Sequence, residues 1–302
     1  MKLTDKITAV GKMQKYIISH LNEKITLDDL SITAGYSKYH AARIFKELTG
    51  TPPLEYIRAV RLTNAAESLR DNGGKVIDAA FESGFDSHDG FTRAFARRFG
   101  ITPKKYASET PPVPYFVQPS VSAYYLLKNE GIIMPNEKVS KIVNVTAVER
   151  PARKLILLRA KNTRDGDYFA YCEEMGCDWD GLLNSIPEKF APAALLTLPQ
   201  NLTKLGTSNT AAGVEVPADY AKPIPENYEI IDLQPCTMLF FQGMPFENED
   251  DFGIAIGIVF EAMRNYAPER YGYAFAPEDA PYFNFGASGK TGALQALPVK
   301  IL

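Results

Sequence analysis

The chain has 302 residues, of which 45% are apolar and 23% are charged, a composition that excludes fibrous and intrinsically disordered classes. That length allows two ordinary domains, each with its own core. No run approaches the ~18 consecutive apolar residues of a membrane span, the start lacks a signal-peptide core, and three cysteines are too few for a disulfide framework, so we expect a cytoplasmic protein with no membrane partner.

The charge is divided unevenly along the chain. Residues 1–110 have a net charge of +4, whereas residues 111–302 have a net charge of −7. A basic part joined to an acidic part indicates that only the first meets a polyanion such as DNA.

The first part contains an internal repeat. Five residue types recur at an offset of 50, and a glycine recurs at an offset of 49 (Arg43/Arg93, Phe45/Phe95, Gly50/Gly100, Pro53/Pro103, Tyr56/Tyr106 and Gly35/Gly84). Such self-similarity predicts a duplicated supersecondary unit.

Each copy has the pattern of a helix, a glycine turn and a second helix. In the first copy Thr26 can cap the first helix, Gly35 can end it, and Ser37 can cap the second. In the second copy Gly84 and Ser87 take the corresponding places. Two short helices that cross at a tight turn form the helix-turn-helix geometry, in which the second helix enters a DNA groove.

The outward residues of both second helices are candidates for DNA binding. An arginine one turn into such a helix can pair with both guanine acceptors, while tyrosine and threonine can contact thymine methyls or phosphates. An ordinary solvated helix face is the alternative for any one of them, but the same placement of Arg43 and Arg93 favours DNA. The candidates are Lys38, Tyr39, Ala42, Arg43 and Lys46 in the first copy, and His88, Asp89, Thr92, Arg93 and Arg97 in the second.

Residues 54–71 predict a long amphipathic helix between the two units. Such a helix spans roughly 27 Å, which would hold the two recognition helices near one duplex turn apart on a single chain. Basic residues nearby are candidates for phosphate contacts, namely Arg58, Arg61, Lys75, Lys104 and Lys105.

The segments AGYSKYHAARIFKELTG and GFDSHDGFTRAFARRFGITPKKY resemble the signature of AraC-type transcription regulators over about residues 8–107, particularly the single-chain group with its DNA-binding part first. The resemblance implies an all-α double helix-turn-helix domain that binds double-stranded promoter DNA, with RNA polymerase as a further candidate partner. It maps base contacts to Tyr39, Ala42 and Arg43, and to His88, Asp89, Thr92 and Arg93. Relatives often carry a glutamine or another polar residue where this chain has Ala42, and Asp89 would repel phosphate, so no operator sequence carries over.

Four prolines between residues 108 and 123 (Pro111, Pro112, Pro114 and Pro119) exclude a helix and predict an extended linker. We therefore expect a DNA-binding domain at 1–107, a proline-rich linker at 108–123 and a second domain at 124–302.

The second domain has a fainter repeat. Residues 143–160 parallel 229–244, helical patterns follow near 179–190 and 251–266, and each copy closes on a strand with a proline, Pro217 or Pro298. Two strand-helix-strand halves related by pseudo-twofold symmetry predict an α+β domain with a groove between the halves.

Residues 140–302 resemble the GyrI-like, or integron-type, effector-binding domain. The resemblance implies that a small-molecule effector enters the central groove, where many relatives carry a glutamate four residues before the final proline. This chain has Leu294 there, which puts a cationic effector in doubt. Glu173, Glu174 and Glu215 are candidate replacements, although the alternation of Glu215 with Val214 and Val216 predicts a solvent-facing position.

Aromatic side chains are the other candidates for the effector site, with an ordinary core role as the alternative. Trp179 lies between Asp178 and Asp180, so we expect it to be partly exposed and to stack on the effector. The candidates are Tyr168, Trp179, Phe241, Tyr282 and Phe283.

No catalytic, cofactor or metal site is predicted. The segment GASGKTG lacks the first glycine of a phosphate loop, Cys172 and Cys177 have no histidine near them, and all three histidines lie in the first part. Two alternatives stay open for the second domain: a GyrI-like hydrolase with acidic residues near Trp179 activating water, or a protein-interaction module without a ligand.

Overall fold

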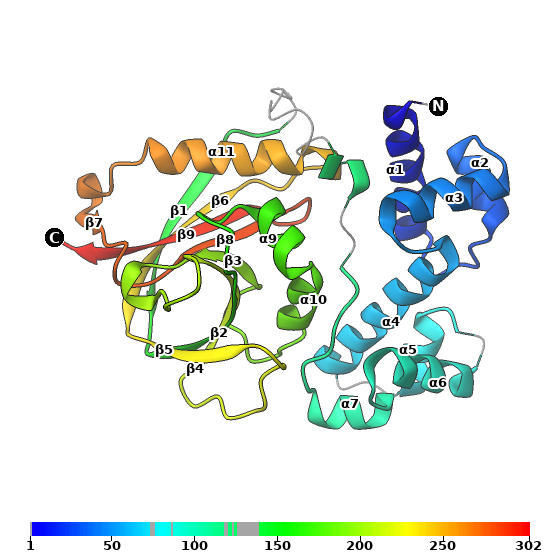
Figure 1. Ribbon diagram of the computed structural model, residues 1–302, viewed down its shortest axis with the longest axis horizontal. Helices are drawn as coiled ribbons and strands as arrows, with labels where there is room; N and C mark the ends of the chain where they lie inside the picture. Colours follow the sequence, from blue (N-terminus) through cyan, green and yellow to red (C-terminus); the bar gives the residue numbers. More distant parts are fainter. Residues whose placement is uncertain (1, 73–75, 86, 118–119, 123, 126–138) are drawn as a thin grey trace. The chain divides into compact units, whose positions relative to one another are not determined.

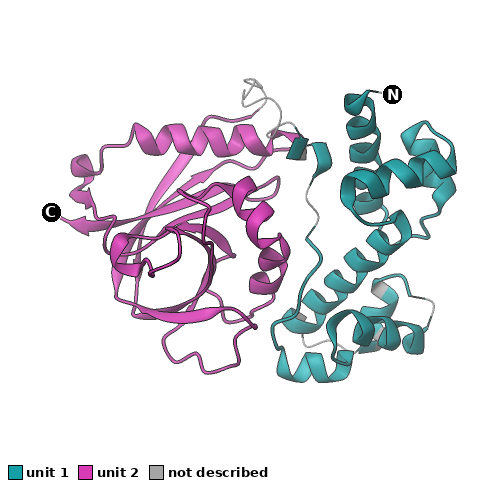
Figure 2. Cartoon of the chain, viewed as in Figure 1, with its two compact units in different colours: residues 1–129 teal, residues 130–302 magenta. Residues whose placement is uncertain are grey.

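The computed structural model describes residues 2–72, 76–85, 87–117, 120–122, 124–125 and 139–302. The chain divides into two compact units, residues 1–129 and residues 130–302 (Figure 2). Within the described residues, no helix is long and apolar enough to cross a membrane.

The elements of regular secondary structure in the first unit are all helices over the described residues (Figure 1). The long helix α4 belongs to both of its apolar cores: Tyr56, Ile57 and Val60 pack with the first helix-turn-helix unit, and Leu62 and Leu69 pack with the second. The predicted pair of helix-turn-helix units is therefore confirmed. The helices are α1 (Leu3–Ser19), α2 (Leu27–Ala34), α3 (Lys38–Thr49), α4 (Pro53–Asn72), α5 (Val76–Glu82), α6 (His88–Phe99) and α7 (Pro103–Glu109).

Side-chain caps set the ends of these helices. Asp29 N–H donates to Thr26 Oγ1 at 3.3 Å, and the Asp29 carboxylate accepts from Thr26 N–H at 2.8 Å, which completes a capping box. Gly35 follows α2 with φ of +70°, and Gly84 follows α5 with φ of +68°, a conformation that costs other residues energy. The predicted caps and turns of both copies are thus confirmed.

The segment after α7 lies against the helical unit. Val113 and Tyr115 are buried in the second core, and Tyr115 Oη lies 2.8 Å from Tyr106 Oη. Phe116 N–H donates to Thr63 Oγ1 on α4 at 2.8 Å, and Val121 N–H donates to Gln14 Oε1 on α1 at 3.0 Å. Residues 111–117 are extended, as predicted, whereas residues 121–122 and 124–125 are helical. Apolar side chains attach the segment to the helices, so these residues are not a free spacer. The predicted end of the DNA-binding domain at residue 107 and of the linker at residue 123 stay predictions.

Replacing Gln14 by alanine is expected to destabilise the first unit by about 1–3 kcal/mol, because Gln14 also donates to Tyr56 Oη at 3.0 Å and both buried partners would lose a hydrogen bond. Urea unfolding of the full chain measures the change. Lys12→Ala, at an exposed position of the same helix, is the control and should differ from wild type by less than about 0.5 kcal/mol. Equal stabilities for both variants would contradict the assigned role.

The second unit is built on one antiparallel sheet in which the strands lie in the order β1-β6-β9-β8-β3-β4-β2-β5, with β7 paired to β9. Exchanging β1 with β5, β6 with β2, β9 with β4 and β8 with β3 reverses this order onto itself. The pseudo-twofold relation between two halves nevertheless stays a prediction. The strands are β1 (Val143–Arg150), β2 (Arg153–Arg159), β3 (Ala194–Thr197), β4 (Thr210–Pro217), β5 (Glu229–Leu233), β6 (Cys236–Gly243), β7 (Tyr273–Phe275), β8 (Tyr282–Ser288) and β9 (Gly292–Ile301).

Three helices cover one face of this sheet. The helices α9 (Tyr168–Met175) and α10 (Asp178–Asn184) pack on β2, β3 and β4, and α11 (Phe252–Arg264) packs on β6 and β9. The predicted helix at 179–190 is shorter than expected because Pro187 cannot continue it, and α9 was not predicted. The other face, the helix-free face, carries an apolar cluster that draws residues from β2, β3, β4, β6, β8 and β9.

Candidate nucleic-acid interface and effector site

The recognition helices α3 and α6 each bury one face and expose the other. Ala41, Ile44 and Phe45 of α3 are buried, as are Phe91 and Phe95 of α6. Most predicted DNA-binding side chains lie on the opposite faces. The exposed ones are Lys38, Tyr39, Arg43, Lys46, His88, Asp89, Arg93 and Arg97, while Ala42 and Thr92 are half-buried.

In the first helix-turn-helix unit, Tyr39 is 81% exposed at the start of α3. Arg43 lies one turn further on, with Nη2 at 3.1 Å from His40 Nδ1. Lys38 forms an ion pair with Asp28 of α2 at 2.5 Å, between side chains that are both more than half exposed. An aromatic ring and a guanidinium thus face solvent together, and these groups suit contacts to thymine methyls and to guanine O6 and N7.

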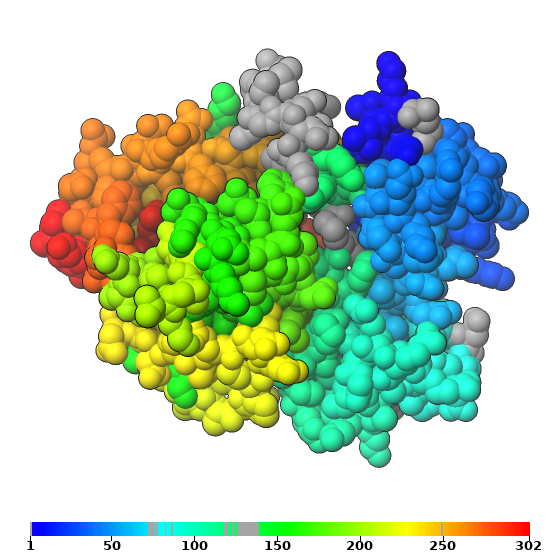
Figure 3. All heavy atoms as spheres, in the orientation of Figure 1, coloured from blue at the N-terminus to red at the C-terminus, as the bar shows by residue number. Residues whose placement is uncertain are grey.

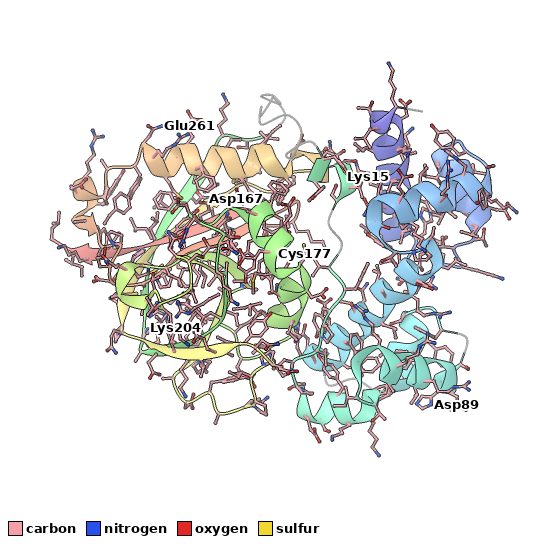
Figure 4. All side chains as sticks on the ribbon, in the orientation of Figure 1. Lys15, Asp89, Asp167, Cys177, Lys204 and Glu261 are labelled. Atoms are coloured by element: carbon pink, nitrogen blue, oxygen red, sulfur yellow. The ribbon has the colours of Figure 1, made fainter. Side chains whose placement is uncertain are left out.

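In the second helix-turn-helix unit the corresponding surface, on α6, is less basic. Arg93 Nε donates to the Asp89 carbonyl at 3.3 Å, and His88 Nδ1 lies 3.6 Å from the Asp89 carboxylate, whose side chain is 91% exposed. Asp89 points outward from α6 (Figure 4). A carboxylate at this place would repel phosphate but could accept a hydrogen bond from the cytosine amino group.

The phosphate candidates divide into two groups. Arg61 donates through Nε to the Leu21 carbonyl at 2.9 Å and through Nη2 to the Glu23 carbonyl, so it fastens the loop after α1. A phosphate contact by Arg61 stays a prediction. The remaining candidates Arg58, Lys104 and Lys105 are exposed, and Lys75 lies outside the described residues.

The 20-residue helix α4 separates the two helix-turn-helix units, whose atoms are blue and cyan in the space-filling view (Figure 3). At ~1.5 Å per residue it spans roughly 30 Å, close to the ~34 Å of one duplex turn. The spacing suits two recognition helices of one chain that enter successive major-groove segments.

The five aromatic candidates for the effector site lie in separate places. Tyr168 lies on α9 and Trp179 on α10. Phe241 lies in the core under α11, where its ring meets the Tyr266 ring edge-on with 5.1 Å between ring centroids. Tyr282 lies beside Phe260 and donates through its hydroxyl to Gln295, whereas Phe283 belongs to the helix-free face. These five side chains therefore do not line one site.

Trp179 differs from its expected environment. It is only 6% exposed and meets the Tyr171 ring edge-on, with 6.0 Å between ring centroids. The expectation of a partly exposed tryptophan is wrong, because α10 turns the indole toward the sheet while Asp178 faces solvent.

Glu215 is also buried, contrary to the expectation. Its side chain is 4% exposed, and its carboxylate pairs with Arg153 Nε and lies 3.5 Å from Arg150 Nε. Alternation with Val214 and Val216 correctly separates the two strand faces, but the helix-free face buries Glu215 beside Arg153.

Glu174 has a structural role at the end of α9. Burial alone would raise its pKa, but hydrogen bonds from Lys161 N–H at 2.7 Å, from the Thr163 hydroxyl and N–H at 2.8 Å each, and from Asn162 N–H outweigh this effect. Together they lower the pKa of Glu174 to about 2. This carboxylate holds residues 161–163 and is not a free replacement for the glutamate missing at Leu294.

Replacing Glu174 by alanine is expected to lower the free energy of unfolding near pH 7 by about 1–3 kcal/mol. Because the folded pKa lies below the unfolded one, the stabilisation is complete above pH ~5 and is lost as the pH falls toward 2. Urea unfolding at pH 7 and pH 3 measures this difference. The neighbouring exposed Glu173→Ala is the control, and a pH-independent gap between the two variants would contradict the assignment.

A stacked aromatic array on the helix-free face was not predicted. Phe240 and Phe285 stack with 6.1 Å between centroids at 20°, and Phe285 and Phe283 stack at 5.7 Å and 13°. The Arg150 guanidinium lies 5.1 Å from the Phe240 ring centroid. Strand alternation could have placed Phe283 and Phe285 on one face, but only the β8–β9–β6 pairing brings Phe240 beside them.

The model of a family described as "Helix-turn-helix domain" matches residues 30–109. The Right origin-binding protein of Escherichia coli (strain K12) is 42% identical over 102 residues, 34% of this chain and 35% of its own length. The chain thus spans about a third of the length of that relative. The Probable transcription factor PqrA of Proteus vulgaris is 42% identical over 99 residues, which are 32% of this chain and 81% of that protein.

A solved structure of SAV2435 bound to tetraphenylphosphonium covers 52% of this chain and 94% of its own, at 14% identity and a TM-score of 0.34. The family model over residues 30–109 spans both capped recognition helices, α3 and α6. The chain therefore belongs to the AraC-type family of helix-turn-helix DNA-binding proteins.

Proposed function

We propose that this protein is a sequence-specific transcription regulator that binds double-stranded promoter DNA through both helix-turn-helix units of one chain. The observation that carries the proposal is the exposed arginine at the same place in α3 and α6, Arg43 and Arg93, on two serine-capped helices joined by α4. The regulatory role is supported by the relative named as a transcription factor.

Selection of bound duplexes from a random library tests this proposal with the purified full chain. We expect an asymmetric motif with two conserved segments about one helical turn, or ~10 base pairs, apart. Binding should weaken steeply with salt because phosphate contacts release counterions. Failure to enrich any motif, or enrichment of a palindrome bound by two chains, would contradict the proposal.

We further propose that the second unit binds a planar small-molecule effector at the Phe240–Phe285 stack. The GyrI-like resemblance and the symmetric strand order support an effector domain. Arg150 and Arg153 share the single carboxylate of Glu215, so this trio carries a net positive charge beside the rings. With Leu294 in place of a glutamate, this surface favours an effector with a carboxylate or another anionic group over a cationic one.

Thermal unfolding of the full chain with a panel of aromatic carboxylates and aromatic cations tests the effector proposal. A bound effector at 100 times its Kd should add about 2.7 kcal/mol of stability and raise Tm. We expect aromatic carboxylates to raise Tm in wild type and in Arg264→Ala, an exposed site on α11, but not in Arg150→Met. Stabilisation by cations alone, or equal stabilisation of Arg150→Met, would contradict it.

A further inference from the structure

One segment, residues 111–125 (the strap), contacts the apolar cores of both helix-turn-helix units. Val113 and Tyr115 are buried in the core that contains α6, whereas Phe116 and Val121 pack in the core that contains α3. Each core supports one recognition helix, so the strap is attached to the supports of both.

The strap follows one side of α4 (Figure 1). It contacts Tyr56, Thr63 and Arg70 of that helix, which are seven residues, or about two turns, apart. The Phe116 ring meets the Tyr56 ring edge-on with 4.9 Å between centroids, and Phe116 N–H donates to Thr63 Oγ1 at 2.8 Å. The Arg70 guanidinium lies 5.7 Å from the Tyr115 ring centroid. From Arg70 to Tyr56 these contacts cover roughly 21 Å of α4.

Phe116 connects the two recognition helices through side-chain contacts. Phe45 of α3 meets the Tyr56 ring edge-on with 5.1 Å between centroids, and Tyr56 in turn meets Phe116. The Arg98 guanidinium of α6 lies 5.9 Å from the Phe116 ring centroid, and Arg98 Nη2 donates to the Pro114 carbonyl at 3.5 Å. A continuous series of contacts therefore runs from α3 through α4 and the strap to α6.

The end of the strap is anchored on α1. Val121 N–H donates to Gln14 Oε1 at 3.0 Å. Gly11, about one turn earlier on α1, lies so close to Ser122 that a Cβ atom at Gly11 would collide with the Ser122 hydroxyl. Because this anchor does not involve the Phe116 ring, we expect the strap to stay attached when that ring is removed.

Two recognition helices that bind one duplex must keep a fixed relation to each other. One base pair added between two major-groove segments moves the second segment by ~3.4 Å and turns it by roughly 34° about the duplex axis. A single connecting helix fixes the distance between the two helix-turn-helix units but leaves each unit able to turn about its own end of that helix. A second connection beside it, made by the strap, opposes such a rotation.

We propose that the strap sets the spacing of the DNA site by fixing α3 relative to α6, with Phe116 as the positioning residue. This inference rests on the proposed binding of one duplex by both helix-turn-helix units. Phe116 acts on α3 through Tyr56 and on α6 through Arg98, and not by contacting a base. Without its ring, both recognition helices should keep their base preferences but lose their strict spacing.

Fluorescence anisotropy with the full chain tests this on three duplexes: the selected site, and the same site with one base pair added to or removed from its spacer. We expect wild type to bind the altered duplexes roughly tenfold more weakly, because one recognition helix then loses its base contacts. Phe116→Ala should lower this ratio to about threefold or less, whereas Phe116→Tyr, which keeps the ring, should retain the wild-type ratio. A loss of folded protein would weaken binding to all three duplexes equally and leave the ratio unchanged.

Two further variants make the test specific. Val117→Ala is the matched control, because this neighbouring half-buried side chain belongs to neither core, and it should keep the wild-type ratio. Thr63→Val removes the acceptor of the Phe116 N–H with little change in size, so it should lower the ratio even if Phe116→Ala fails to fold.

The outcomes separate this inference from the proposed function. Equal ratios in wild type, Phe116→Ala and Thr63→Val would overturn the positioning role and leave binding by two recognition helices intact. Equal binding of all three duplexes by wild type would also overturn it, because no fixed spacing would then exist. If the selection enriches no motif with two segments, the proposed function and this inference both fail.

Discussion

Replacing Glu215 by alanine is expected to lower the free energy of unfolding of the second unit by about 3–5 kcal/mol. The substitution leaves the buried guanidinium of Arg153, whose side chain is fully buried, without its carboxylate, and it removes the ion that also faces Arg150. The carbonyl of Gln234, which accepts from Arg153 Nη1 at 2.8 Å, cannot neutralise that charge. Urea unfolding followed by Trp179 fluorescence measures the loss.

Lys222→Ala is the matched control for the buried pair. Lys222 pairs with Glu188 at 2.5 Å in the same unit, but its side chain is 42% exposed, so the expected loss is within about 1 kcal/mol. If Glu215→Ala is no less stable than Lys222→Ala, this result would contradict the role of Glu215 as the buried counter-ion of Arg153.

Arg43→Ala and Arg93→Ala are each expected to weaken specific DNA binding by about 1–3 kcal/mol, or roughly 5- to 150-fold. Each removes a guanidinium that can bond to both guanine acceptors from one turn inside a recognition helix. Folding should be unaffected because both side chains are exposed. Fluorescence anisotropy with the selected duplex at fixed salt measures the change.

Arg164→Ala is the control for these arginines, since it removes an exposed guanidinium from the second unit. Its affinity should equal that of wild type. Equal losses on specific and unrelated duplexes would show that Arg43 and Arg93 contact phosphates and do not determine the sequence preference.

Much of the first unit follows from its sequence because short-range chemistry sets it. Thr26, Ser37 and Ser87 cap helices through their own hydroxyls, and Gly35 and Gly84 take positive φ at the turns, so local residues suffice to place these elements. The attachment of Phe116 to Thr63 joins residues 53 positions apart, and no local pattern indicates it. The same holds for Arg61, whose carbonyl partners lie about 40 residues earlier.

The second unit shows where sequence patterns stop. Alternation places Glu215 and Val214 on opposite faces of β4, but whether a face is covered depends on partners distant in the sequence, here Arg153 and Arg150. The flanking aspartates predict an exposed Trp179, but α10 directs its indole toward the sheet. The Phe240–Phe285 stack depends on the pairing of β6 and β8 with β9, and the alternation of residues within these strands does not specify that pairing.

Dimethyl sulfate footprinting of guanine N7 in the selected duplex, with wild type, Arg43→Ala and Arg93→Ala, tests the central claim most directly. If one chain binds with both units, wild type protects two major-groove segments about 10 base pairs apart. Arg43→Ala should then lose contacts in one segment and Arg93→Ala in the other. Loss of the same segment in both variants, or full protection in both, would contradict binding by two recognition helices of one chain.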